Sequence, residues 1–413
     1  MVEQGGDRVG SARVEVPVAV VTEPELVREA YTVFKRAMAG LEFGPFDPVE
    51  VTEPGRFLAA YDGARIVGSA NSFATHLTVP GGARLPHAAV SQVGVLPTHR
   101  RRGVVTALMR KQLTDAAAAG EPVATLRASE GGIYGRFGYG IASHVRSARI
   151  DRRKVRFAAP GAPGGSVRLA DTDGVAVLAP IAARAAQNGA VSRADVWWRK
   201  WELRSAEHTG PSYLAVHSTE GVDDGYVTYR PLDTAGWFTS ENKTIEVTEL
   251  VALNPAAHQG LWRHLLELDL VDTVSIGTLA LDDPLPLLFT DERAVTLGPV
   301  RDESWLRLTD VPAALGARTY GEAAPVHLAV HDALLPQNDG VYRIGADGAV
   351  RAAAGTPAQV TVSVSDLAAT YLGGTRWWRL VAAGRVQAAE PDAVARLDRL
   401  FAVDREPYAG VFF

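Results

Sequence analysis

Residues 93–110 read VGVLPTHRRRGVVTALMR. The β-branched start predicts a short strand, and Pro97 leads from it into a basic turn that ends at Gly103. From Val105 onward the apolar residues recur at helical spacing, so a helix begins beside Gly103 and its first backbone N–H groups lack partners within the helix. The stretch predicts a strand, a basic loop and a helix in immediate succession.

This helix start predicts an anion-binding site. The aligned amides of a first helical turn attract negative charge, and the arginines before Gly103 add to that attraction. Gly103 lets the backbone approach a diphosphate closely, which suits the pyrophosphate of a nucleotide-type cofactor. The alternative is a surface turn whose arginines are only solvated.

Composition narrows the class of protein. A chain of 413 residues with 47% apolar residues is too long for one core and divides into two or three domains. No run of about 18 apolar residues occurs, and no signal pattern opens the chain, so we expect a cytoplasmic protein without a membrane partner.

Several chemistries are disfavoured. The absence of cysteine rules out disulfides and thiolate catalysis, and the ten histidines are scattered, so we expect no metal. A net charge of -5 and the small extent of the basic loop argue against nucleic-acid binding.

A second stretch repeats the order of the first. Residues 248–266 read TELVALNPAAHQGLWRHLL, again a strand, a proline, a turn, a glycine and a helix. The loop is shorter by one residue, and Ala256, Ala257 and His258 stand where the first copy has arginines. We infer a duplicated α/β fold whose second copy no longer binds a cofactor and instead forms one side of the substrate site. The alternative is that the two stretches are similar by coincidence.

A glycine-dense block follows the first helix. Residues 128–140 read ASEGGIYGRFGYG and contain two phenols. The arginine loop is similar to the acetyl-CoA signature of the GNAT acetyltransferases, whose positions are taken here by Arg100, Gly103 and Val105, although Val105 is larger than the usual last residue. With the glycine block, the chain resembles the enhanced intracellular survival (Eis) family across nearly its whole length.

The resemblance implies an α/β architecture of three domains. These are a catalytic GNAT domain at 14–144, a degenerate GNAT domain at 145–298, and a sterol-carrier-like α+β domain at 299–413 whose C-terminus takes part in catalysis. The family forms homohexamers, so the same assembly is expected here.

The resemblance also assigns catalytic roles. Tyr134 is the expected general acid, and the terminal carboxylate of Phe413 is the expected proton acceptor. Tyr139 is the alternative phenol, and Tyr134 has the alternative role of covering the cofactor. The expected acetyl-CoA contacts are Val93, Gly94, Val95, Arg101, Arg102, Gly103, Val104, Val105, Thr106, Ser129 and Glu130.

The expected reaction is direct attack of a neutral primary amine on the thioester of acetyl-CoA in a ternary complex. A cationic small-molecule acceptor, such as an aminoglycoside or similar polyamine, favours a pocket with carboxylates, to which Glu42, Glu202 and the Phe413 carboxylate are candidates. For the two glutamates the alternative is simple solvation. Two other functions stay open: acetylation of protein lysines or small metabolic amines, and a non-catalytic acetyl-CoA- or lipid-binding module.

Overall fold

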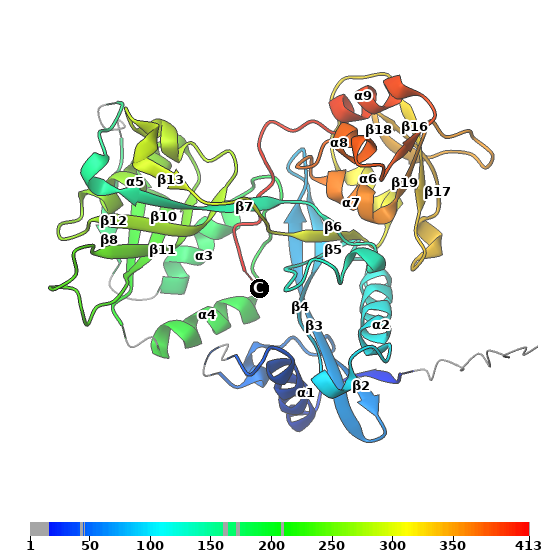
Figure 1. Ribbon diagram of the computed structural model, residues 1–413, viewed down its shortest axis with the longest axis horizontal. Helices are drawn as coiled ribbons and strands as arrows, with labels where there is room; N and C mark the ends of the chain where they lie inside the picture. Colours follow the sequence, from blue (N-terminus) through cyan, green and yellow to red (C-terminus); the bar gives the residue numbers. More distant parts are fainter. Residues whose placement is uncertain are drawn as a thin grey trace, which may run out of the picture.

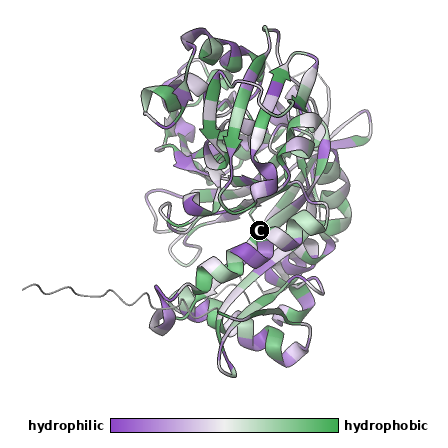
Figure 2. Cartoon of the chain, turned by 90° about the vertical axis from the view of Figure 1, so that its right-hand side faces the viewer, coloured by the Kyte–Doolittle hydropathy of each residue, from purple (hydrophilic) through white to green (hydrophobic). Residues whose placement is uncertain are grey.

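The computed structural model describes residues 16–41, 44, 46–159, 164–170, 174–207 and 210–412. Within these ranges the strands form three β-sheets, with helices packed against each (Figure 1). Figure 2 shows hydrophobic and hydrophilic residues mixed along the helices and strands.

The first sheet has seven strands in the order β1-β2-β3-β4-β5-β15-β6. Helices α1 and α2 cover opposite faces. A Cβ atom on Gly68 of β3 would meet Val104 and Leu108 of α2, whereas one on Gly94 of β4, which pairs with the next residue of β3, would meet Phe34 and Ala37 of α1. The bounds are β1 Val18–Val20, β2 Leu58–Asp62, β3 Arg65–Thr78, β4 Arg84–Val95, β5 Val123–Leu126, β6 Gly140–Ile141, α1 Pro24–Ala37 and α2 Val104–Ala118.

Strand β15, Trp305–Leu308, belongs to this first sheet although it comes late in the chain. It pairs antiparallel with both β5 and β6. All four of its residues are buried, so the strand needs neighbours on both edges and both faces. The predicted third domain begins at 299, but two strands after that residue belong to the other sheets: Arg301–Asp302 to the second sheet and β15 to the first.

The second sheet has eight strands. Its main order is β13-β7-β12-β11-β10-β9-β8, and β14 also pairs with β7. Helix α5 shares a core with one face, while α3 and α4 pack near β9 and β10. The bounds are β7 His144–Asp151, β8 Ser166–Leu169, β9 Tyr213–Thr219, β10 Val222–Pro231, β11 Thr244–Ala252, β12 Thr273–Ala280, β13 Val295–Leu297, β14 Arg301–Asp302, α3 Gly174–Arg184, α4 Asp195–Glu207 and α5 Pro255–Glu267.

The third sheet has five strands in the order β18-β17-β16-β19-β20. Its apolar residues join those of β3, β4, β5 and β15 of the first sheet in one core. A buried ion pair between Arg307 and Asp332, at 2.6 Å, crosses this contact. The bounds are β16 Val326–His331, β17 Gly340–Gly345, β18 Gly348–Arg351, β19 Val360–Ser363, β20 Gln387–Ala388, α6 Val311–Ala317, α7 Val364–Tyr371, α8 Trp377–Ala382 and α9 Pro391–Leu400.

The segment after α9 returns to the middle of the molecule. It runs between the second sheet and the first, and its last described residues lie beside α4 (Figure 1, red). Trp197 of α4 donates from Nε1 to the carbonyl oxygen of Phe412 at 2.8 Å. The end of the chain thus lies at the meeting point of the first two sheets.

Candidate active site

Strands β4 and β5 open a gap in the first sheet. They pair in parallel over His87–Ala89 and Val123–Thr125. Beyond these residues β4 continues along β3 to Val95, whereas β5 ends at Leu126. We call the opening between residues 90–95 and the chain after Thr125 the first wedge. The predicted contacts Val93, Gly94 and Val95 lie on its β4 side.

A β-bulge distorts the β4 side of the first wedge. The register on β3 shifts between Ser69 and Asn71, and Gln92 has a φ of 53°, a left-handed conformation that is costly for a residue with a side chain. Ser69 donates from Oγ to the Gln92 carbonyl oxygen at 3.1 Å, and Asn71 donates from Nδ2 to Gln92 Oε1 at 3.0 Å. The bulge therefore frees part of the β4 backbone from regular pairing at the wedge, a feature that the sequence reasoning missed.

The start of α2 has the predicted form. Gly103 is its N-cap residue, with a left-handed φ of 85° and no side chain to cap the helix. The first backbone bond runs from the Ala107 N–H to the Gly103 carbonyl oxygen at 3.0 Å. The N–H groups of Val104, Val105 and Thr106 precede that bond, so they have no acceptor within the helix.

The basic loop before α2 is exposed. Arg101 has a φ of 63°, and the side chain of Arg102 is 62% exposed, at 3.8 Å from Asp62. An exposed ion pair at that distance contributes little binding energy, so the guanidinium is available to a ligand. The arginines and the open amides of α2 lie in consecutive residues, a combination suited to a diphosphate.

The glycine-dense block packs closely against α7. A Cβ atom on Gly140 would lie 2.1 Å from the carbonyl oxygen of Ser365, and one on Gly138 would lie 2.8 Å from Arg307. Ser365 also donates from Oγ to the Tyr139 carbonyl oxygen at 2.7 Å. Gly140 thus permits contact between two backbones, and Gly138 permits the close approach of the Arg307 side chain; the sequence alone indicated neither.

The two phenols of this block differ in exposure. Tyr139 is completely buried, whereas Tyr134 is 5% exposed, and their rings meet edge to face at 5.9 Å. Burial, with a further contribution from the charge of Glu130, raises the pKa of Tyr134 to about 12. Ser129 and Glu130 are exposed in the loop between β5 and Tyr134. Tyr134 is therefore protonated at neutral pH.

Of the two glutamates predicted to bind the acceptor, the structure describes Glu202. Glu202 lies on α4, with its side chain 48% exposed and 3.5 Å from Arg199, which also binds Glu50 at 2.9 Å. On the same helix, burial followed by repulsion from Arg204 lowers the pKa of Lys200 to about 8. Glu42 and Phe413 lie outside the described residues.

The residues before Phe413 are held by two groups that the sequence reasoning missed. Arg127 donates from Nη2 to the Val411 carbonyl oxygen at 2.5 Å, and Glu303 accepts from the Ala409 N–H at 3.0 Å. Arg127 and Glu303 bind each other at 3.0 Å. A small cavity lies between this tail and the first wedge, and its lining consists of Phe73, Thr75, Ala89, Val191, Ser192, Arg193, Ala194, Trp197 and Val411.

The helix start in the second sheet differs from that of α2. Asn254 caps α5, and its Oδ1 accepts from the Ala257 N–H at 2.8 Å. Asn254 Nδ2 is bound in turn to Asp224 at 2.7 Å. A side-chain oxygen therefore occupies one of the amides that an anion would use.

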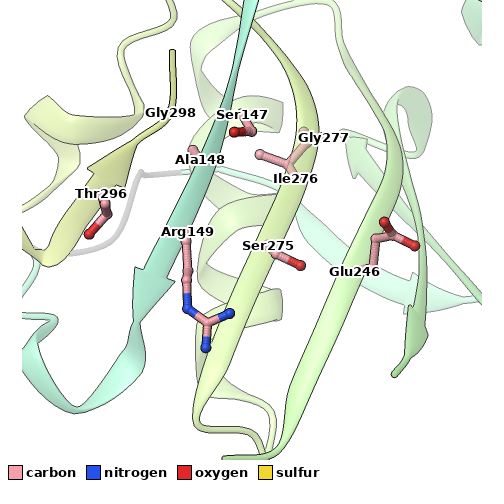
Figure 3. Close-up of a pocket in the computed structure, with 9 residues that line it drawn as sticks. All are labelled: Ser147, Ala148, Arg149, Glu246, Ser275, Ile276, Gly277, Thr296 and Gly298. Carbon is pink, nitrogen blue, oxygen red and sulfur yellow. The ribbon is translucent and has the colours of Figure 1, made fainter. Parts of the chain in front are cut away.

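Another hollow lies on the face of the second sheet, over β7, β11, β12 and β13 (Figure 3). None of the predicted site residues lines it. Among the described residues, no cluster of three or more histidine, aspartate or glutamate side chains is arranged to hold a metal ion. In those same ranges, no helix has both the length and the apolar character needed to cross a membrane.

The same three parts occur in known proteins. Residues 24–142 and 189–308 each match an acetyltransferase (GNAT) domain family, and residues 311–410 match a sterol carrier protein domain. The chain is 38% identical over 362 residues to the N-acetyltransferase Eis of Mycobacterium tuberculosis. The matched region covers 83% of this chain and 84% of that protein. This chain belongs to the Eis family of GNAT N-acetyltransferases. The predicted fold class of tandem GNAT folds and a sterol-carrier-like domain is confirmed.

Other relatives agree with this family membership. The crystal structure of Eis1 from Mycobacterium abscessus superposes with a TM-score of 0.91 at 45% identity and covers 96% of this chain and 100% of that one. An uncharacterized N-acetyltransferase of Streptomyces avermitilis is 39% identical over 87% of this chain and 89% of its own length. The protein is therefore an N-acetyltransferase, and the GNAT fold implies that it uses acetyl-CoA.

Proposed function

We propose that this Eis-family protein transfers the acetyl group of acetyl-CoA to a primary amine of an aminoglycoside or a similar polyamine, by direct attack in a ternary complex. One observation carries the proposal. The β4 side of the first wedge leads to Arg102 and the open amides of α2, and the β5 side leads to Arg127, which binds the tail at Val411. Donor and acceptor thus have separate approaches to one gap in the sheet. The chain has no cysteine, so no thiol acyl-enzyme is involved.

The donor site uses the residues around Gly103. The amides of Val104, Val105 and Thr106 and the side chains of Arg101 and Arg102 bind the pyrophosphate. Val93, Gly94 and Val95 pair with the pantetheine arm, and an amide of the bulged strand stabilises the tetrahedral oxyanion. Ser129 and Glu130 flank the site from the loop after β5.

The reaction balances with two protein groups. The amine nitrogen forms a bond to the thioester carbon, and the carbon–sulfur bond then breaks. Tyr134 donates its phenolic proton to the departing thiolate, and its raised pKa keeps that proton in place until charge develops on sulfur. The proton lost by the amine passes to the terminal carboxylate of Phe413.

The carboxylate of Phe413 has a second role, which is to orient the amine. An α-carboxyl group titrates near about 3.5 and an alkylammonium near about 10.4, so direct deprotonation is strongly uphill and the proton moves through water. The bonds of Arg127 to Val411 and of Trp197 to Phe412 support a fixed direction for the last residue.

A second acceptor class is favoured by α4. Arg199 binds Glu202 and Glu50, and Lys200 and Arg204 add positive charge to the same helix. Asp195, Glu202 and Glu207 balance these three basic residues, so the helix has no net charge and offers a polycation no acidic surface. An acceptor with a single amine does not need such a surface. Acetylation of a protein lysine or a small metabolic amine is therefore the second candidate function.

A thiol-release assay with acetyl-CoA tests the proposal against an aminoglycoside, an aliphatic diamine and a lysine peptide. We expect the highest kcat/KM for the aminoglycoside, and a higher value for the lysine peptide would favour the second candidate. No thiol release with any acceptor, together with acetyl-CoA binding by calorimetry, would point to a non-catalytic module. Calorimetry should give one acetyl-CoA per chain, because Asn254 caps the second helix start.

Homohexameric assembly and a cytoplasmic location stay predictions of this proposal. Light scattering of the purified protein checks the first, and cell fractionation checks the second.

A further inference from the structure

The second sheet contains an opening like the first wedge. Strands β11 and β12 pair in parallel over Thr244–Val247 and Thr273–Ile276. Beyond Val247, β11 continues along β10 to Ala252. Strand β12 stays paired with β7, and the register of that pairing shifts between Ile276 and Leu279. We call the opening between residues 248–252 and 277–280 the second wedge. Asn254 caps the helix that follows β11, so this opening is poorly suited to a diphosphate.

The tail of the chain contacts the second wedge. Tyr408 donates from Oη to the carbonyl oxygen of Thr278 at 3.3 Å, and Thr278 lies two residues beyond the last paired residue, Ile276. Asp282 lies just past β12 and accepts from Arg405 Nε at 2.8 Å and from the Glu406 N–H at 3.1 Å. Residues 405–408 are therefore bound along this side of the opening.

The same tail reaches the corresponding place in the first wedge. Arg127 lies two residues beyond Thr125, as Thr278 lies two residues beyond Ile276. Arg127 binds the carbonyl oxygen of Val411. Four residues of the tail, 408–411, thus connect equivalent positions of the two copies, and Glu303 binds Ala409 between them.

Two glycines fix the path between the wedges. A Cβ atom on Gly189 would lie 3.0 Å from the Tyr408 backbone nitrogen, and one on Gly410 would lie 3.3 Å from Tyr408 Cε1. Gly410 also has a φ of 68°, which a residue with a side chain adopts only with strain. The chain therefore turns tightly around the Tyr408 ring before it enters the first wedge.

Polar groups surround the Tyr408 hydroxyl. Burial raises its pKa, and the nearby carboxylates of Glu303 and Glu249 raise it further, so the phenol is neutral and free to donate to Thr278. Arg193 forms an ion pair with Glu249, and Arg127 forms one with Glu303, so each carboxylate has a partner of opposite charge. The tail therefore packs beside two ion pairs and not beside unpaired carboxylates.

We propose that the second wedge is the binding site for segment 405–409 of this same chain, and that this binding positions the last residues at the first wedge. The degenerate copy has exchanged a cofactor site for a site that takes an internal peptide. Tyr408 is accordingly a positioning residue. The proposal rests on the proposed function only in giving the terminal carboxylate a part in acetyl transfer.

Hydrogen exchange of the full-length protein tests the binding without reference to activity. The Tyr408 N–H donates to Asn188 and the Ala409 N–H to Glu303, so the peptide covering 404–412 should exchange slowly. Tyr408→Ala should speed its exchange by about tenfold or more, whereas Tyr408→Phe, which keeps the ring, should change it by less than about threefold. The matched control is Tyr213→Ala, an exposed tyrosine of β9 in the same sheet.

Unchanged exchange in Tyr408→Ala would overturn the proposal. If Tyr408→Ala does not fold, Asp282→Asn serves instead, because it weakens the anchor of Arg405 and Glu406 at the rim of the wedge. That variant should give faster exchange of the tail peptide alone, and no change would again overturn the proposal.

Kinetics then separates the two proposals. Tyr408→Ala should lower kcat by about tenfold and leave the KM for acetyl-CoA unchanged, because the amides and arginines of the donor site are untouched. Faster exchange with unchanged kcat would support tail binding by the second wedge and contradict the catalytic part of the terminal carboxylate. A raised KM for acetyl-CoA would contradict the positioning role.

Discussion

Arg127 donates a hydrogen bond to the Val411 carbonyl oxygen across 284 residues of chain. The same Nη2 atom also binds Glu303 at 3.0 Å, and the guanidinium lies 5.5 Å from the centre of the Phe412 ring. Because Arg127 directly follows β5, these contacts connect the edge of the first wedge with the end of the chain. A proton acceptor at the C-terminus requires such a connection.

Replacement of Arg127 should therefore separate activity from stability. Arg127→Lys keeps a cation beside Glu303 but loses the planar donor and the stacking on Phe412. We expect kcat to fall by about tenfold, with the KM for acetyl-CoA unchanged. Arg127→Ala should also destabilise the fold by about 3 kcal/mol, because the Glu303 carboxylate is 1% exposed and would lose its charge partner.

The control for Arg127 is Arg136→Lys. Arg136 lies in the same region and stacks on Phe137 at 4.8 Å, but it is exposed and, within the described residues, makes no hydrogen bond to the tail. Steady-state kinetics and urea unfolding measure both effects. Equal losses of kcat in the two variants would contradict the role assigned to Arg127.

Tyr134→Phe tests the proposed role of Tyr134 as proton donor. We expect kcat to fall by about 100-fold, the lower end of the range for a general acid. Since the pKa of Tyr134 is raised to about 12, the phenol stays protonated through pH 10 in the free enzyme. The pH profile of kcat/KM below pH 10 should thus keep its shape in the variant while its height drops.

Tyr139→Phe is the matched control for Tyr134. The Tyr139 hydroxyl is buried and has no hydrogen-bond partner in the part of the chain that the structure describes. Removal of an unpaired buried hydroxyl costs no hydrogen bond, so kcat should be unchanged and stability should be equal or slightly higher. Full turnover in Tyr134→Phe, or a large loss in Tyr139→Phe, would reverse the assignment.

Gly103→Ala tests the donor site. The glycine has a φ of 85°, and an added Cβ would meet open space, so backbone strain is the main cost, about 1–2 kcal/mol. Relief of that strain would turn the N–H groups of Val104 and Val105 away from the ligand. We expect the KM for acetyl-CoA to rise by about tenfold, measured at saturating acceptor.

Gly120→Ala supplies a control of the same chemistry. Gly120 has a φ of 73°, lies at the other end of α2, and also faces open space. The two variants should lose similar stability, but only Gly103→Ala should weaken acetyl-CoA binding. A parallel rise of KM in both would show that α2 stability, not the local amides, controls the donor site.

The sequence predicted the features that depend on local order. Residues 93–110 form the predicted strand, basic loop and helix because proline, glycine and helical periodicity act over a few residues. The repeat at 248–266 was visible for the same reason. Even the loss of the arginines indicated a changed role, and Asn254 shows how the second helix start is satisfied instead.

Other features depend on partners distant in the chain. The bulge at Gln92 involves no glycine, and it is held by side chains from β3. Gly138 and Gly140 permit close contact with β15 and α7, which local turn chemistry does not reveal. The buried strand Trp305–Leu308 falls inside the predicted third domain, 299–413. Nothing near it in the sequence indicates that it pairs with β5 of the first sheet.

A last prediction concerns His87, at the point where the first wedge opens. Its imidazole bridges Thr75 Oγ1 at 2.6 Å and Thr125 Oγ1 at 2.8 Å, joining three strands of the sheet. Burial lowers its pKa to about 3, with smaller contributions from His76 and Arg56. The folded protein therefore holds His87 neutral between pH 5 and pH 7.

This lowered pKa makes stability depend on pH in a defined direction. In the unfolded chain the histidine titrates near about 6.5, so below that pH the unfolded state binds a proton that the folded state does not. The stabilisation is complete above pH 6.5 and is lost as the pH falls toward 3. Between pH 7 and pH 5 the free energy of unfolding should drop by about 2 kcal/mol from this residue alone.

Urea unfolding of the wild type and of His87→Gln at the two pH values measures this difference. Glutamine retains a donor and an acceptor for Thr75 and Thr125 but does not titrate, so the variant should be less stable at pH 7 and lose about 2 kcal/mol less than the wild type on acidification. His327→Gln, at a half-buried histidine of β16, controls for the loss of a histidine from the chain. An equal pH dependence in wild type and His87→Gln would mean that the bridge between the strands tolerates a protonated imidazole.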